Sequence, residues 1–293
     1  HFRQAAKNIF SFFGDRQISV KSAVTVEPTL ILEKTRGKNR AILASLRLRI
    51  GQDRLYVVKS IKRLLYSMEN NIELKFGKKF MYVPSSHEFK GKGLLLINML
   101  YEIYETEALM EKLSDNPEVT SVFSDDRVYL TDSLLKRFLE IYADTPFKAD
   151  IFGKTLDPIR VRKEDIPVNF ILSSEGSDLV LTIDFEGSLI PITNDGEYFF
   201  NGSDIFHISK QQSEYLKPFY LAMMYQKGRK LRFIQEDKQR FVSEILPFAE
   251  KAGKLTISDE VQAIIEKYPL QTEIYLDRQG AEILAEVRFI YGE

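Results

Sequence analysis

The sequence predicts an α+β protein in which antiparallel β-hairpins pack against helices, in two tandem related units followed by a terminal hairpin. The main observation is a hairpin pattern that occurs three times, over residues 28–51, 167–187 and 269–292. Each copy opens with a proline, turns at a glycine and closes with a second glycine. The turn glycines are Gly37, Gly176 and Gly280.

The second strand of every copy alternates between apolar and mostly polar side chains, as expected of a strand with one buried face. In the first copy the apolar residues are Leu46, Leu48 and Ile50, with Arg47 and Arg49 between them. Such hairpins also recur by chance in β-rich proteins, which is the alternative explanation.

We favour an internal duplication because the elements between the hairpins correspond as well. Leu130, at the end of one expected strand, stands eight residues before Phe138 in the helix that follows. Phe233 stands eight residues before Phe241 in the same way. The third hairpin then represents a copy that is cut off. Because the chain begins at His1 and stops directly after a strand, we expect it to be a segment of a longer protein.

Local patterns predict the elements in order. Residues 1–14 have helical spacing, residues 15–26 are expected to form a linker and then a strand, and the first hairpin follows. The first unit then continues with a strand at 55–58, a helix from about 60, a hairpin at 72–83, a helix at 94–110, a strand at 127–130 and a helix at 133–142. Ser60 and either Thr131 or Asp132 are expected to cap helices, and Gly77-Lys78 to turn the hairpin.

The second unit repeats this order. After its hairpin we expect strands at 189–193, 198–200 and 204–208, a helix at 211–226, a strand at 230–234, a helix at 237–251, a strand at 255–257 and a helix at 258–267. We place the unit boundary in residues 144–166, where prolines, glycine and charges mix without clear periodicity. The predicted division is an N-terminal helix and linker (1–26), a first unit (27–150), a second unit (151–267) and the third hairpin (268–293).

The formal net charge of −1 conceals an uneven distribution. Residues 34–92 carry 15 Lys and Arg against 4 acidic residues, whereas residues 93–150 carry 5 basic against 12 acidic residues. Such blocks bear on partners and solubility rather than on fold. The chain has no cysteine and no apolar run long enough to span a membrane, so we expect a cytoplasmic protein without disulfides or membrane contact.

No catalytic constellation is apparent: the sequence contains no phosphate loop, no HExxH and no GxSxG. Asp125-Asp126 would suit magnesium, but beside Ser124 and between expected strands a solvated turn is the better interpretation. The segment Gly91-Lys92-Gly93 would suit an anion, although such segments are more often ordinary helix starts. We therefore predict no catalytic residue, metal, cofactor or small-molecule substrate for this chain.

Clustered basic residues are the functional signal that remains. The candidate nucleic-acid contacts are Arg36, Lys38, Arg40, Arg47, Arg49, Lys75, Lys78, Lys79, Lys90 and Lys92. Further basic runs lie at 160–163 and 227–232. Clustered cations neutralise phosphates and release counterions, which gives salt-dependent binding. The alternative is a solvated strand face with edge lysines that block aggregation.

The runs LRLRIGQDRLYVVKSIKRLL (46–65) and ELKFGKKFMYVPSSHEF (73–89), with the terminal YGE (291–293), resemble the helicase-associated domain of bacterial Swi/Snf-type ATPases. The resemblance covers most of the chain from about residue 25, is clearest in 46–89 and is weaker in the second unit. It implies that a zinc-binding SWIM module precedes this region in the full protein and that a DNA-dependent ATPase motor follows it. ATP and Mg are implied only for that motor, whose catalytic residues have no counterpart here.

The basic block and the resemblance together predict a non-catalytic accessory domain of a bacterial Swi/Snf-type DNA-dependent ATPase. The domain is expected to contact double-stranded DNA through its basic hairpins or to regulate the attached motor. The alternative is a protein–protein docking scaffold that does not touch nucleic acid. An enzyme in its own right, such as a metal-dependent nuclease that uses Asp125 and Asp126, is the least favoured hypothesis.

Overall fold

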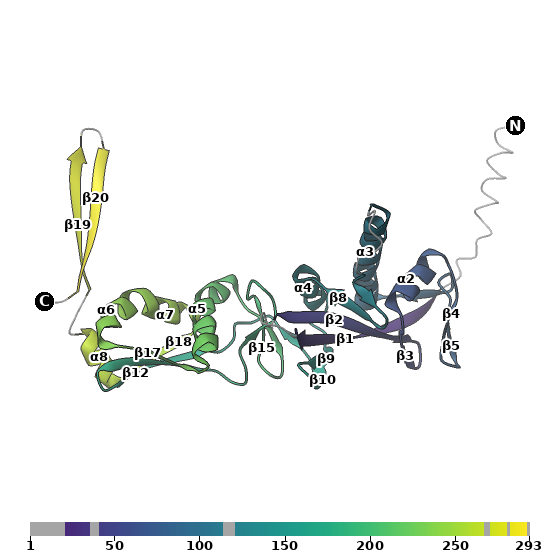
Figure 1. Cartoon of the computed structure of the whole chain (residues 1–293), viewed down its shortest axis with the longest axis horizontal. Coiled ribbons are helices and arrows are strands. Elements are labelled where there is room, and N and C mark those ends of the chain that lie inside the picture. The colour runs from purple at the N-terminus through teal and green to yellow at the C-terminus, as the bar shows by residue number, and fades with distance from the viewer. Residues whose placement is uncertain (1–20, 36–40, 114–120, 267–269, 280–281, 292–293) are drawn as a thin grey trace. The chain divides into compact units, whose positions relative to one another are not determined.

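The computed structural model describes residues 21–35, 41–113, 121–266, 270–279 and 282–291. The chain divides into two compact units, residues 1–161 and 162–293 (Figure 1). The helix expected at residues 1–14 lies outside the described residues, as do the turns expected at Gly37 and Gly280.

Unit 1 is built on a mixed sheet. Its strands are β1 (Ser22–Lys34), β2 (Ile42–Gly51), β3 (Leu55–Val57), β6 (His87–Phe89), β7 (Phe123–Ser124), β8 (Arg127–Leu130), β9 (Phe147–Ile151) and β10 (Lys154–Ile159). The order is β10-β9-β1-β2-β8-β7, with β3 beside β2 and β6 beside β1. Strands β4 (Leu74–Phe76) and β5 (Phe80–Tyr82) form a separate hairpin. The mixture of strands and helices confirms the predicted α+β class.

The predicted alternation of β2 is confirmed, because Leu46, Leu48 and Ile50 are at most 1% exposed. The strand expected at the end of residues 15–26 and the first strand of the hairpin expected from Pro28 form one continuous strand, which begins at Ser22. On the side of β1 away from β2, β6 pairs with residues 22–24 and β9 with residues 29–32. Pro28 lies between these two partners, where that edge of β1 is free and a missing N–H is tolerated.

Three helices lie on one face of this sheet: α2 (Ile61–Glu69), α3 (Gly91–Leu113) and α4 (Asp132–Ile141) (Figure 1). The predicted caps are confirmed, because the hydroxyls of Ser60 and Thr131 accept hydrogen bonds from N–H groups in the first turns of α2 and α4. Helix α3 begins three residues before the predicted start at Leu94. The N–H of Leu94 donates to the carbonyl of Lys90, which closes a first turn over residues 91–93.

Residues 144–166 contain strands that the sequence did not predict. Strand β9 pairs in parallel with β1, and β10 pairs antiparallel with β9. Phe147, Ala149 and Ile151 do alternate with half-buried residues, but the pattern is only five residues long and includes a small alanine. A short strand that is buried by a distant partner leaves little periodic signal of its own.

Unit 2 also combines sheets with helices. Its strands are β11 (Val161–Arg162, which begins at the last residue of unit 1), β12 (Asn169–Glu175), β13 (Asp178–Asp184), β14 (Ile190–Pro191), β15 (Tyr198–Phe200), β16 (Ile205–His207), β17 (Lys230–Phe233), β18 (Lys254–Ile257), β19 (Leu270–Gln279) and β20 (Glu282–Tyr291). Its α-helices are α5 (Lys210–Gln226), α6 (Lys238–Arg240), α7 (Leu246–Ala252) and α8 (Asp259–Glu266). The sheets have the orders β17-β13-β12-β18 and β11-β16-β15-β14, and β19 and β20 form a two-stranded sheet.

The core of unit 2 lies between the first of these sheets and helices α5 and α7, and it includes Phe170, Leu181 and Leu216. The helix expected at 237–251 is present, but not all of its turns are α-helical. A 3-10 turn (Gln235–Asp237) and a π-helical turn (Phe241–Ile245) flank α6. Pro247, in the first turn of α7, has no N–H to donate to the preceding turn, so the backbone widens before it.

Four strands at the centre of the eight-stranded sheet of unit 1 are arranged like the four strands of the β17-β13-β12-β18 sheet of unit 2. In unit 1 the hairpin β1–β2 is flanked by β9, parallel to β1, and by β8, antiparallel to β2. In unit 2 the hairpin β12–β13 is flanked by β18, parallel to β12, and by β17, antiparallel to β13. The four strands also follow in the same order along the chain. Phe138 and Phe241, which follow β8 and β17, are both buried.

Candidate nucleic-acid interface

The β4–β5 hairpin carries the most exposed cluster of predicted contact residues. Leu74 pairs with Tyr82, Lys75 with Met81, and Phe76 with Phe80. Because side chains alternate along a strand, Leu74 and Tyr82 are buried while Lys75 and Met81 face solvent as a cross-strand pair. The predicted turn at Gly77 is confirmed, and its φ of +63° places this residue in the left-handed region.

Aromatic side chains hold the hairpin against the rest of unit 1. The ring of Phe80 stacks on Tyr56 with centroids 6.0 Å apart. The ring of Tyr82 stacks on His87 and Phe89, at 5.8 and 5.5 Å. Aromatic pairs at these separations contribute beyond simple burial. These contacts hold the backbone of the hairpin in place, and with it the positions from which its lysine side chains extend into solvent.

Lys75, Lys78 and Lys79 are exposed, and none of them forms an ion pair with a residue that the structure describes. Three unneutralised cations thus stand on a few residues of one hairpin, together with the exposed side chain of Met81. Closely spaced free ammonium groups produce a local positive potential, which attracts anions.

The other predicted contacts differ in their surroundings. Arg49 pairs with Glu27 at 3.2 Å, and Lys90 pairs with Glu88 at 2.9 Å. Nε of Arg47 lies 2.9 Å from Oδ2 of Asp126, within ion-pair distance but without hydrogen-bond geometry. Lys92 lies in the first turn of α3 and is half-buried.

These acidic neighbours offset part of the cationic charge that the sequence suggested for the strand face. The remaining predicted contacts, Arg36, Lys38 and Arg40, lie outside the described residues.

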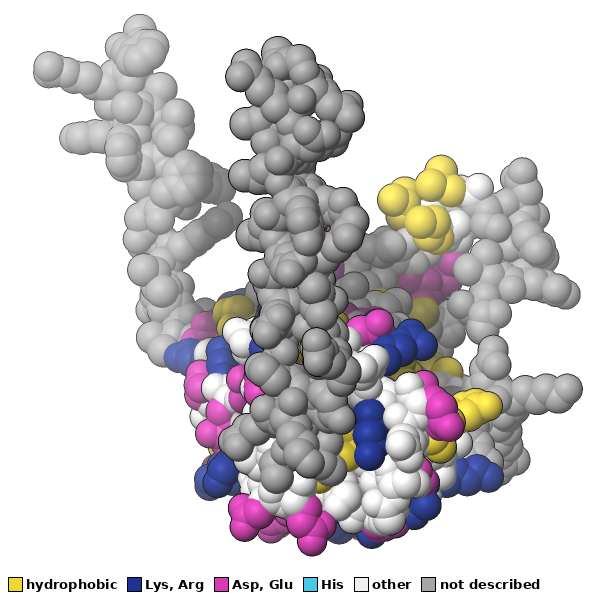
Figure 2. All heavy atoms as spheres, turned by 90° about the vertical axis from the view of Figure 1, so that its left-hand side faces the viewer, with side chains coloured by type: hydrophobic (Ala, Val, Ile, Leu, Met, Phe, Trp, Pro, Cys, Tyr) yellow, Lys and Arg dark blue, Asp and Glu magenta, His cyan; other side chains and the backbone are white. Residues whose placement is uncertain are grey.

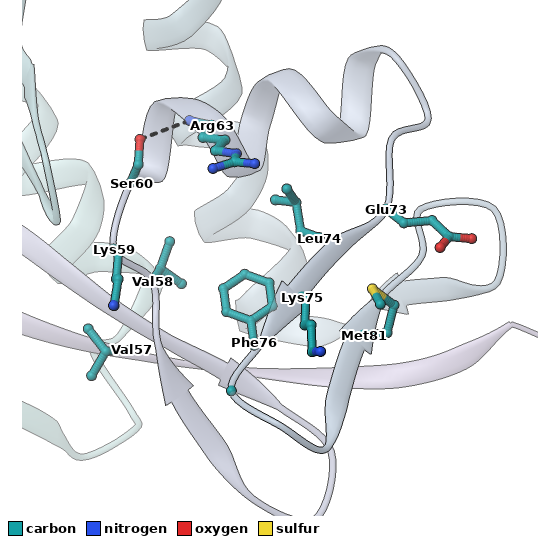
Figure 3. Close-up of a pocket in the computed structure, with 11 residues that line it drawn as sticks. Val57, Val58, Lys59, Ser60, Arg63, Glu73, Leu74, Lys75, Phe76 and Met81 are labelled. Atoms are coloured by element: carbon teal, nitrogen blue, oxygen red, sulfur yellow. Dashed lines mark hydrogen bonds between the residues drawn. The ribbon is translucent and has the colours of Figure 1, made fainter.

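A cavity of about 520 Å³ opens beside the hairpin, between β4–β5 and the chain that leads from β3 into α2. Figure 3 shows the ring of Phe76 in the middle of the lining residues, with Lys59 on one side and Lys75 on the other. The lining residues are Val57, Val58, Lys59, Ser60, Arg63, Glu73, Leu74, Lys75, Phe76, Gly77 and Met81.

Sequence reasoning missed Lys59 and Arg63. Both belong to the basic stretch 34–92. Lys59 directly precedes the helix cap Ser60, and Arg63 lies on the exposed face of α2. In these positions the sequence pattern predicts ordinary solvated cations. Only the fold places them on the wall opposite Lys75. No local pattern carries that information, because the hairpin and α2 meet through tertiary contacts.

An ion-pair network fixes α2, and with it one wall of the cavity. Nζ of Lys62 lies 2.6 Å from Oε1 of Glu107 on α3, whose side chain is 7% exposed. Glu107 also accepts hydrogen bonds from the hydroxyl of Ser121 and the N–H of Val122. Burial raises the pKa of this carboxyl group, but the hydrogen bonds outweigh burial and the pKa lies below its usual value.

Three basic residues of the run 227–232 make contacts within unit 2. The guanidinium of Arg229 lies 3.9 Å from the ring centre of Phe185 and donates to the carbonyls of Phe185 and Gly187. Lys230 and Arg232 both pair with Glu175. Among the coloured side chains that face the viewer in Figure 2, basic and acidic residues are interspersed.

Asp125-Asp126 forms the turn between β7 and β8, as expected. Within the described ranges, no group of three or more His, Cys, Asp or Glu is arranged to hold a metal ion. None of the helices in the described part of the chain has the length and apolar character needed to cross a membrane.

These features define a class of protein: a two-unit α+β domain with a fixed basic hairpin. The family follows from comparison with known proteins. Residues 127–293 match the family described as bacterial SNF2 helicase associated, and the chain belongs to this family. The match begins after the stretch 46–89 and includes unit 2, whereas the sequence resemblance was expected to be clearest in 46–89 and weaker in the second unit. No curated protein and no solved structure matches the chain.

Proposed function

We propose that the chain is a non-catalytic accessory domain of a bacterial SNF2-type DNA-dependent ATPase, and that it contacts DNA through the β4–β5 hairpin. The observation that carries the proposal is the set of three exposed lysines, Lys75, Lys78 and Lys79, which have no ion-pair partner among the described residues. Family membership supports the SNF2 context. ATP and Mg would act in the motor, and a cytoplasmic location follows from the same context.

The test is fluorescence anisotropy of a labelled DNA duplex, titrated with the chain over a series of salt concentrations. Binding through three lysines neutralises about three phosphates, which gives a log–log salt slope of about −3. Replacing Lys75, Lys78 and Lys79 by glutamate is expected to remove most of this affinity and to flatten the slope.

A matched control carries the same charge change on unit 2. Lys210, Lys217 and Lys254 are exposed and have no ion pair with a described residue. Their replacement by glutamate should weaken binding much less than the hairpin variant. Equal losses in both variants would show that only net charge matters, and unchanged affinity of the hairpin variant at low salt would refute the DNA contact.

A second candidate function, docking on another protein without touching nucleic acid, is favoured by a different observation. Helix α5 exposes Leu221, Met224 and Tyr225 on one face, at 49%, 67% and 90%. Exposed apolar groups at helical spacing are typical of protein contacts. Co-elution of the chain with the separately expressed motor, abolished by Met224→Asp with Tyr225→Asp, would support this function.

The proposal includes the origin of the two units by internal duplication. The shared strand order and chain order of the four matching strands in each unit support it, as does the position of Phe138 and Phe241 after equivalent strands. The β19–β20 hairpin, with ten residue pairs in register, then corresponds to the start of a further copy.

A further inference from the structure

The cavity beside the β4–β5 hairpin is cationic. Lys59, Arg63 and Lys75 line it, all three are exposed, and none pairs with an acidic residue in the described part of the chain. Glu73 is the single acidic residue among the eleven that line the cavity. These cations come from two parts of the chain, the β3–α2 segment and strand β4, and line the same cavity. Such an arrangement suits a phosphate group, because the walls of a cavity focus the positive field.

The same cavity also presents apolar surface. Val57 and Met81 are 53% and 42% exposed, and the ring of Phe76 lies between Lys59 and Lys75 (Figure 3). Phosphate binding alone gains nothing from a half-buried aromatic ring. A ring surrounded by cations is what an unpaired nucleotide requires, since its base stacks on the ring while its phosphates meet the cations.

Double-stranded DNA does not match this combination. Its bases are stacked inside the helix, so that a protein surface meets mainly phosphates and groove edges. Lys78 and Lys79 extend the cationic lining beyond the cavity along the hairpin turn, which suits a chain with one charge per nucleotide. We propose that the cavity binds single-stranded DNA, with phosphates at Lys59, Arg63 and Lys75 and one base against Phe76.

This inference rests on the proposed function only for the choice of nucleic acid as partner. The test compares a labelled single strand of about 12 nucleotides, within the length that one such site covers, with a duplex of the same sequence. Phe76→Leu keeps an apolar side chain and removes the aromatic face. It is expected to weaken single-strand binding about tenfold, the effect of losing one stacked base, and to leave duplex affinity within about twofold.

Two further variants make the test specific. Lys59→Glu with Arg63→Glu changes the wall opposite the hairpin, and single-strand affinity should fall more than duplex affinity. Tyr66→Leu, on an exposed aromatic residue of α2 outside the cavity, should change neither. Circular dichroism of each variant checks that the fold is retained.

The outcomes separate the two proposals. Equal losses for both DNA forms, or unchanged single-strand binding in Phe76→Leu, would overturn the single-strand site while duplex binding still supported the DNA contact. Absence of all DNA binding by the unmodified chain would refute the proposed function, and this inference with it. An acidic peptide that displaces the single strand and itself loses affinity in Phe76→Leu would overturn the choice of ligand.

Discussion

A Cβ atom on Gly77 would lie 2.8 Å from Cε1 of Tyr56, closer than real Cβ contacts allow. The turn of the β4–β5 hairpin thus packs directly on an aromatic side chain from β3. Tyr56 in turn stacks on Phe80 and lies under the guanidinium of Arg54. The position of the exposed lysines depends on this contact, because it joins their hairpin to the sheet of unit 1.

Gly77→Ala should therefore destabilise unit 1. The left-handed backbone alone costs about 1–2 kcal/mol for a residue with a side chain, and the contact with Tyr56 adds to this. Gly91→Ala is the matched control, because Gly91 also has a positive φ but nothing lies within 4 Å of its Cβ position. Urea unfolding followed by circular dichroism measures both. Equal losses for the two variants would contradict the importance of the Tyr56 contact.

Glu107→Gln should loosen α2 from α3. The free energy of unfolding is expected to fall by about 1–2 kcal/mol, because three hydrogen bonds lose a charged acceptor. Glu111→Gln is the control: Glu111 also contacts Lys62, at 2.9 Å, but its side chain is 50% exposed. An exposed ion pair contributes at most about 1 kcal/mol. Similar losses of stability in both variants would therefore argue against a special role for the buried carboxylate of Glu107.

The same carboxylate predicts a dependence of stability on pH. The pKa of Glu107 is lower in the folded chain than in the unfolded chain. Its stabilisation is therefore present above the unfolded value of about 4.3 and is lost as pH falls through the folded pKa. Unfolding midpoints from about pH 7 down to about pH 3 should fall less steeply in Glu107→Gln than in the unmodified chain.

At alkaline pH two buried tyrosines are expected to titrate late. Burial raises the pKa of Tyr82 to about 12 and that of Tyr142 to about 12. Because the folded-state pKa is the higher one, their contribution is present below the unfolded value of about 10 and is lost as pH rises through about 12. Tyrosinate absorbance measures this, and Tyr82→Phe should remove part of the late-titrating signal. An unchanged late phase would refute the assignment.

In unit 2, Gln212 joins two segments that are distant in sequence. Its buried amide accepts from the N–H of Ile166 at 2.8 Å and donates to the carbonyls of Ile166 and Ala252 at 2.9 Å each. Gln212→Ala leaves these backbone groups without a partner and should cost about 2–3 kcal/mol. Gln211→Ala, on the exposed neighbour, should stay within about 0.5 kcal/mol. Urea unfolding measures both variants. Equal losses of stability would argue against a structural role for the hydrogen bonds of Gln212.

Much of the fold was predictable because its signals are local. The buried alternation of Leu46, Leu48 and Ile50, and the caps at Ser60 and Thr131, depend on a few neighbouring residues. Strand β9 escaped prediction because its identity as a strand comes from pairing with β1, far away in the chain.

The candidate site was only partly predictable. The basic hairpin is visible in the sequence, since Lys75, Lys78 and Lys79 lie close together around a turn glycine. That Arg47 lies beside Asp126, and that Arg63 faces the hairpin cavity, depends on tertiary packing. Charge density along a chain thus overstates the free charge on a surface, because the fold supplies acidic partners from distant segments.

The late position of the parallel strands has a consequence for biosynthesis. As the polypeptide leaves the ribosome, β1 and β2 emerge long before β9, and β12 and β13 long before β18. Until then one edge of each hairpin remains open to other nascent chains and to chaperones. Parallel pairing between distant segments is intrinsically slow. Closure of each sheet therefore waits for translation of its last strand, and the two units complete their folding one after the other.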